Sequence, residues 1–175
     1  MSNIPQGYRP VGDNRVREIV GRGLEEFTVG EVIEHRPART VSDMDRSMVL
    51  ALTGNPAPVH SDAEYCERTG RERLLVCGIT TLGIVVGATV RSTSGMTSAN
   101  LALDDVRFTN PVHVGDTLRA ETEVLAARPS QSRPDHGVVT CRTAAFNQRN
   151  EQVLAFTRTF LVPADATTVR DATSY

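Results

Sequence analysis

The sequence contains no lysine and no tryptophan, so all 19 basic residues are arginine, and aromatic residues make up only 5% of the 175 positions. With 21 acidic residues the formal net charge is −2. No block of basic residues of the kind that binds nucleic acid is present. The longest apolar run, residues 83–90, is far too short to span a bilayer. We therefore expect neither a nucleic-acid partner nor a membrane partner.

Cysteine is scarce as well. Cys66, Cys77 and Cys141 are odd in number and form no C-x-x-C pair, which argues against a disulfide framework and against a zinc site. No G-x-G-x-x-G motif follows a predicted strand. The first ten residues lack the charged-then-apolar pattern of a signal peptide. These absences favour a reducing cytoplasm, and we expect no metal and no redox cofactor.

The length of the chain is sufficient for one domain with its own core. Residues 1–24 are polar, with several glycines and arginines, and we predict that they form an N-terminal extension over the domain. The domain itself is predicted to comprise residues 25–165. Residues 166–175 are polar, and we expect them to be a flexible tail.

The first half of the domain is predicted to hold one strand and three helices. Residues 30–39 form an edge strand, in which Pro37 limits pairing. Ser42 is the predicted N-cap of a helix that stops at Gly54. A short helix at 62–68 precedes the main helix, residues 79–90, which is apolar almost all round and is expected to be buried. Glycines 83 and 87, costly inside a helix, indicate tight packing of this helix against a sheet.

Four strand-like segments follow the main helix, at residues 100–109, 117–128, 137–147 and 152–162. The second of them alternates apolar and charged residues cleanly, as a half-buried strand does. A helix followed by an antiparallel meander suggests a curved sheet wrapped around that helix. The predicted fold class is therefore α+β.

The segment with the clearest chemical content is residues 52–62, L-T-G-N-P-A-P-V-H-S-D. Pro56 and Pro58 fix backbone angles and stiffen the loop that presents His60. Loops held by a rigid scaffold often carry function. From the spacing alone, an ordinary turn with a surface histidine is an equally good interpretation.

Five motifs together make the sequence resemble the MaoC-like (R)-specific enoyl-CoA hydratases, a family with the hot-dog fold. They are T-G-N-P-A-P-V-H-S-D at 53–62, C-G-I-T-T-L at 77–82, P-V-H-V-G-D-T-L at 111–118, S-Q-S-R-P-D-H-G at 130–137 and F-N-Q-R at 146–149. The turn at 111–118 is common to much of the hot-dog superfamily. The segments at 130–137 and 146–149 resemble the branch of mesaconyl-CoA and itaconyl-CoA hydratases.

The resemblance implies reversible addition of water to an enoyl thioester of coenzyme A or of an acyl carrier protein, by a homodimer or higher even oligomer. The coenzyme or phosphopantetheine is then part of the substrate. By position, His60 matches the histidine that activates water, and Gly78 matches the glycine whose amide binds the thioester carbonyl. Asn55 stands where this family has an aspartate. An imidazole can take a proton from water near pH 7, whereas an amide can only orient the water. We hypothesise that His60 is the base and that Asn55 orients the water.

Four further residues complete the predicted binding site. Arg133 offers a bidentate fork for a substrate carboxylate or a phosphate. Cys77 and Ile79 flank Gly78. Asp62 is a second candidate carboxylate, although its spacing suits helix capping equally well. Two other functions stay open: a hot-dog acyl thioesterase, and a non-catalytic acyl-thioester-binding subunit, since Asn55 replaces the aspartate.

Overall fold

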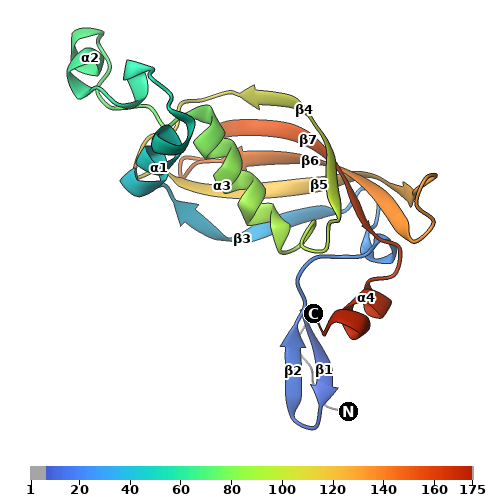
Figure 1. Ribbon diagram of the computed structural model, residues 1–175. Helices are drawn as coiled ribbons and strands as arrows, with labels where there is room; N and C mark the ends of the chain where they lie inside the picture. The colour runs from blue at the N-terminus through green and yellow to red at the C-terminus, as the bar shows by residue number, and fades with distance from the viewer. Residues whose placement is uncertain (1–6, 175) are drawn as a thin grey trace.

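The computed structural model describes residues 7–174, and its largest element is a five-stranded antiparallel sheet. The helix α3 (Gly78–Val90) lies across one face of this sheet (Figure 1). Each predicted strand agrees with an observed one to within two residues, and the α+β class is confirmed. In spatial order the strands are β3 (Val32–Thr40), β5 (Thr117–Pro129), β6 (His136–Phe146), β7 (Gln152–Pro163) and β4 (Ala99–Phe108).

The order of the strands departs from a simple meander. Strands β5, β6 and β7 pair consecutively, but β4 pairs with β7 at one edge, and β3 occupies the place beside β5. The connection from β4 to β5, residues 109–116, therefore crosses the end of the sheet. On its way Val112 O accepts a hydrogen bond from Val76 N at 2.8 Å, just before α3 begins. This crossing brings the turn at 111–118 to the amino end of the main helix.

The helix α1 (Asp43–Thr53) begins and ends as predicted. Ser42 Oγ accepts from Asp45 N at 3.2 Å, and Asp45 Oδ2 accepts from Ser42 N at 2.8 Å, which is a reciprocal capping box. Gly54 ends the helix in the left-handed region, with φ of 62°. Beyond it come a 3₁₀ turn η2 (Pro58–His60) and the short helix α2 (Ala63–Arg68), which lie past one end of the sheet (Figure 1).

One side of α3 packs on the sheet and the other is uncovered within the described chain. Val85, only 2% exposed, joins a core cluster of sheet residues that includes Leu154 and Phe156. By contrast Ile79 is 59% exposed, and apart from the adjoining residues and the backbone of the helix itself no described atom lies within 4 Å of a β-carbon built at Gly83 or Gly87. The expectation that this helix is buried all round, with its glycines against the sheet, is therefore wrong for the single chain, because the glycines face away from the sheet.

Buried polar side chains fasten the carboxyl end of α3 to the sheet. Arg158 of β7 donates through Nη2 to the hydroxyls of Thr89 and Thr93, at 3.3 Å each, and to that of Ser94 at 2.8 Å. Its guanidinium also lies 4.8 Å from the ring centre of Phe160. Burial lowers the pKa of Arg158 from its ordinary value, although the group stays charged at any physiological pH.

His35 of β3 makes a second set of hydrogen bonds, which joins the turn just after the helix to the sheet. Its ring nitrogens bond to Ser92 Oγ at 2.8 Å and to Thr122 Oγ1 at 2.7 Å. Burial, with smaller contributions from the nearby Arg158 and Arg22, lowers the pKa of His35 from 6.5 to about 4. The imidazole is consequently neutral in the folded protein at neutral pH.

Both ends of the described chain differ from expectation. The predicted flexible tail instead contains the helix α4 (Ala166–Thr173), where Arg170 donates to both carboxylate oxygens of Glu26 at 2.8 and 2.9 Å. The predicted extension lies outside the described residues at 1–6. From residue 7 it contains a hairpin of β1 (Tyr8–Gly12) and β2 (Arg15–Glu18), which points away from the sheet rather than lying over it (Figure 1). A 3₁₀ turn η1 (Leu24–Glu26) then leads into the domain.

Candidate active site

A short backbone segment, residues 74–76, holds the candidate base. Leu75 N donates to Val59 O at 3.0 Å, and the Nδ1 of His60 lies 2.8 Å from Leu75 O. A carbonyl can only accept, so Nδ1 carries the hydrogen of this bond. In the neutral ring Nε2 is then left as the acceptor, which is the atom a general base needs. Arg46 Nη1 donates to His60 O at 2.6 Å and fixes the backbone at the same residue.

Asn55 lies at the other side of the same loop and reaches the start of α3. Its Oδ1 accepts from Ala57 N at 3.0 Å, and its Nδ2 donates to Cys77 Sγ at 3.7 Å. Cys77 is the N-cap position of α3, directly before Gly78. Two contacts, at Leu75 and at Cys77, thus bring the loop of His60 and Asn55 to the amino end of the main helix.

The amino end of α3 opens into a cleft of about 240 Å³. Gly78 and Thr81 line it from the helix, and Phe108 lines it from the end of β4. A β-carbon at Gly78 would lie 2.9 Å from Phe108 Cζ, so any larger residue would displace the ring. Within the described chain the side chain of Cys77 makes no capping hydrogen bond. First-turn amides without side-chain partners, together with the helix dipole, suit an oxygen that gains negative charge.

The turn at 111–118 closes this end of the sheet. The buried Asp116 accepts from His113 N at 2.9 Å and from Gln148 Nε2 at 2.8 Å, which joins the motif at 111–118 to the motif at 146–149. Burial alone would raise the pKa of Asp116, but these two hydrogen bonds and the nearby Arg149 outweigh it and leave the pKa below its ordinary value. Asp116 therefore holds the turn as a carboxylate.

Comparison with known proteins identifies the family. The profile described as mesaconyl-CoA hydratase matches residues 7–174. The chain belongs to this family. The mesaconyl-CoA hydratase of Cereibacter sphaeroides is 35% identical to it over 156 residues, which are 85% of this chain and 45% of the relative.

Two solved structures agree with this assignment and confirm the hot-dog fold. A Chloroflexus aurantiacus protein described as a MaoC domain dehydratase is 30% identical, with a TM-score of 0.77 over 82% of this chain and 40% of its own. A Mycobacterium tuberculosis protein described as having a double hot-dog fold is 26% identical, with a TM-score of 0.74 over 83% of this chain and 45% of its own. The chain spans about half the length of the curated relatives it matches.

In this member of the mesaconyl-CoA hydratase family, two of the remaining predicted residues, Cys77 and Ile79, lie at the amino end of α3. Cys77 is buried and contacts Asn55, whereas Ile79 points to solvent within the single chain. Asp62 accepts from Tyr65 N at 2.9 Å and is the N-cap of α2. The capping interpretation of Asp62 is thus the one that its contacts favour.

Arg133, contrary to expectation, is not brought to this cluster. It lies in the loop between β5 and β6, at the end of β6 marked by His136, whereas Phe146 and the turn at 111–118 lie at the other end. The length of β6 separates the two ends by about 33 Å. The motif that contains Arg133 therefore cannot hold an acyl group at Gly78 of the same chain.

Several residues of the site were missed at the level of sequence. Leu75 acts through its backbone carbonyl, which leaves no signal in residue type. Phe108 ends an edge strand, and only the crossing of the chain explains why it meets Gly78. Among residues 7–174 no group of three or more histidine, cysteine or acidic residues is arranged to hold a metal ion. In the same range no helix is both long enough and apolar enough to cross a membrane.

Proposed function

We propose that this chain catalyses reversible addition of water across the 2,3-double bond of an enoyl-CoA, a carbon–oxygen lyase reaction. The observation that supports this most directly is the imidazole of His60. Its Nδ1 is bonded to Leu75 O, its Nε2 is free to accept a proton, and its loop contacts the residue before Gly78. The name of the family supports a small branched dicarboxylic acyl group such as mesaconyl.

In the proposed reaction His60 Nε2 takes a proton from water as the water oxygen bonds to C3. The π electrons move to C2 and the thioester oxygen, and the negative charge on that oxygen is stabilised by the amide of Gly78 and the α3 dipole. One such donor typically contributes about 3 kcal/mol to lowering the barrier. The imidazolium then returns the proton to C2. Protons and electrons balance within substrate, water and imidazole, so we propose that no metal or redox cofactor takes part.

Asn55 has the role of orienting the water. Its Oδ1, which already accepts from Ala57 N, has a second lone pair available for a water hydrogen. The lack of a carboxylate at position 55 also supports a second candidate function, that of a subunit that binds the acyl thioester without catalysing a reaction. The assay described below separates the two.

We further propose that a second copy of the chain completes the site in a cytoplasmic homodimer or higher even oligomer. The chain has about half the length of its curated relatives, and one neighbour has a double hot-dog fold. Within residues 7–174 strand β4 is an edge strand, paired only with β7, and large apolar side chains are exposed on it and on α3, namely Leu101, Leu103, Phe108 and Ile79. The solution mass of the protein tests this assembly, and Leu103→Glu is expected to lower that mass to one chain.

The function is tested with His60→Ala and, as a matched control, His136→Ala at the far end of the sheet. Hydration of crotonyl-CoA and mesaconyl-CoA is measured as loss of the absorbance of the conjugated enoyl thioester. Hydrolysis is measured with a reagent that detects the released thiol. We expect kcat of His60→Ala to fall by about 10²–10⁴-fold and that of the control to change less than two-fold. Thermal melting of both variants checks that they fold.

Each other outcome points to a defined alternative. Full turnover by His60→Ala would remove His60 as the base. Release of free thiol without loss of the double bond would indicate a thioesterase. Tight binding of crotonyl-CoA by the unmodified protein without either change would support the non-catalytic subunit.

A further inference from the structure

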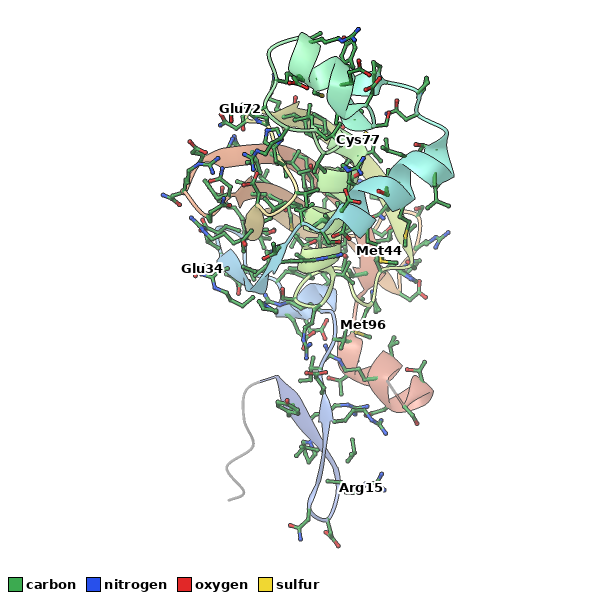
Figure 2. The ribbon with its side chains drawn as sticks, turned by 90° about the vertical axis from the view of Figure 1, so that its left-hand side faces the viewer. Arg15, Glu34, Met44, Glu72, Cys77 and Met96 are labelled. Carbon is green, nitrogen blue, oxygen red and sulfur yellow. The ribbon has the colours of Figure 1, made fainter. Side chains whose placement is uncertain are left out.

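A second cleft, of about 320 Å³, adjoins the cleft at Gly78. The two share Leu75 and Pro111 as lining residues, so they lie side by side near the amino end of α3. Figure 2 shows Glu72, a lining residue of the second cleft, at the same end of the molecule as Cys77 and opposite Met96 and Arg15. The second cleft is therefore adjacent to a thioester bound at Gly78.

The charged side chains of this second cleft are Arg71, Arg73 and Glu72, and all three are exposed. Arg71 donates through Nη1 to Thr69 Oγ1 at 3.0 Å, which leaves the rest of its fork free. Arg73 makes no hydrogen bond or ion pair with another residue of the range 7–174. Two arginines with unused donors outnumber one carboxylate, so the cleft favours an anion.

Two other arginines near this cleft already bind other groups of the protein. Arg68 pairs with Glu64 at 2.5 Å, and Arg46 bonds to Asp43 and to the backbone of His60. His113 closes the wall of the cleft, with Nδ1 2.8 Å from Leu74 O, and leaves its other ring nitrogen free. The free guanidinium donors of Arg71 and Arg73 are thus concentrated in the cleft that adjoins the one at Gly78.

We infer that Arg71 and Arg73 bind the phosphate groups of the coenzyme A moiety, and thereby make this site selective for coenzyme A thioesters over the same acyl group on pantetheine alone. This inference rests on the proposed function. Arginine pairs with phosphate through two parallel hydrogen bonds, which a cleft with an unpaired guanidinium provides. The size of the cleft fits phosphates and part of a nucleotide, while the acyl group occupies the smaller cleft at Gly78.

The test compares crotonyl-CoA with crotonyl-pantetheine in the unmodified protein and in Arg71→Gln, Arg73→Gln and the double variant. We expect KM for crotonyl-CoA to rise about 10-fold for each arginine, as a charge-assisted hydrogen bond predicts. We expect kcat, and every constant for crotonyl-pantetheine, to stay within two-fold. Adenosine 3′,5′-bisphosphate should inhibit the unmodified enzyme competitively and lose this inhibition in the double variant.

Two further variants control for nonspecific electrostatics. Arg68→Gln removes a neighbouring charge that is already paired and lines neither cleft, so it should leave KM for crotonyl-CoA unchanged. Glu72→Gln removes the opposing carboxylate and should lower KM for crotonyl-CoA.

The outcomes separate failure of this inference from failure of the proposed function. Equal effects of the double variant on crotonyl-CoA and crotonyl-pantetheine would overturn the phosphate role while leaving hydration intact. A rise in KM confined to mesaconyl-CoA would mean that the arginines bind the acyl carboxylate, and would also overturn it. Absence of hydration of crotonyl-pantetheine and crotonyl-CoA alike by the unmodified protein would refute the function itself, whereas binding of adenosine 3′,5′-bisphosphate could still be measured.

Discussion

Acidification should destabilise this fold before its carboxylates protonate, because His35 is buried in its neutral form. Its ring is 3% exposed and bonds to Ser92 Oγ and to Thr122 Oγ1, which a neutral imidazole satisfies with one donor and one acceptor. A proton added to the folded state would place a second buried positive charge near Arg158. The unfolded chain takes up this proton with no such cost.

The size of the effect follows from the pKa of His35, which is lowered from 6.5 to about 4. Between these values the unfolded state binds a proton that the folded state does not, so stability falls as the pH falls. At about 1.4 kcal/mol for each pKa unit, the loss over the whole interval amounts to about 3 kcal/mol. This is a large part of the roughly 5–15 kcal/mol that stabilises an ordinary domain.

Urea denaturation at closely spaced pH values, from about pH 7.5 down to about pH 5, measures the effect in a window above the ordinary pKa values of carboxylates. We expect the free energy of unfolding to fall by about 2 kcal/mol from about pH 6.5 to about pH 5. His35→Gln keeps a hydrogen-bonding side chain but cannot be protonated, so its stability should vary much less over this range. If the free energy of unfolding depended equally on pH in the two proteins, the loss of stability could not be assigned to His35.

Three other substitutions have defined expected outcomes. Asn55→Asp supplies a carboxylate that can accept a proton, so initial rates on crotonyl-CoA should rise, and an unchanged rate would argue against any contact of Asn55 with the water. Phe108→Ala opens the cleft at Gly78, so kcat/KM should shift by about 10-fold or more from C4 toward C8 enoyl-CoA substrates in a chain-length series. Arg170→Met removes the guanidinium that pairs with Glu26 and leaves its carboxylate only the hydrogen bond from Gly23 N, so it should cost about 2–3 kcal/mol in urea denaturation. An unaltered denaturation midpoint would be the contrary result.

The elements that the sequence predicted well are those whose signals are local. Ser42 and Gly54 mark the ends of α1 through capping chemistry within a few residues, and both predictions are confirmed. The alternation in residues 117–128 likewise identifies β5. Pairing is a non-local property, and nothing in the pattern of β4 distinguishes β7 from β5 as its neighbour.

Only residues that lie within the recognised motifs were predicted as members of the candidate site. His60 was selected from its proline-stiffened loop and then by resemblance, Gly78 by resemblance, and the two lie in segments that contact each other. Arg133 was selected because a guanidinium can bind a carboxylate or a phosphate, but it lies at the far end of the sheet. Arg71 and Arg73 were overlooked, because the sequence of a polar loop does not reveal whether an arginine in it forms an ion pair.

The fastening of α3 at its carboxyl end has a consequence for catalysis at its amino end. Arg158 hydrogen-bonds to Thr89 in the last turn of the helix, and Arg158 and His35 together bond to Thr93, Ser94 and Ser92 in the turn that follows, so this end of the helix is held against the sheet. In the hydration that we propose, the amide of Gly78 is then already in place for the thioester oxygen, and little reorganisation energy is added to the barrier. A substitution at Arg158, roughly the length of a helix away from the chemistry, should therefore lower the turnover rate more than it weakens the binding of the thioester.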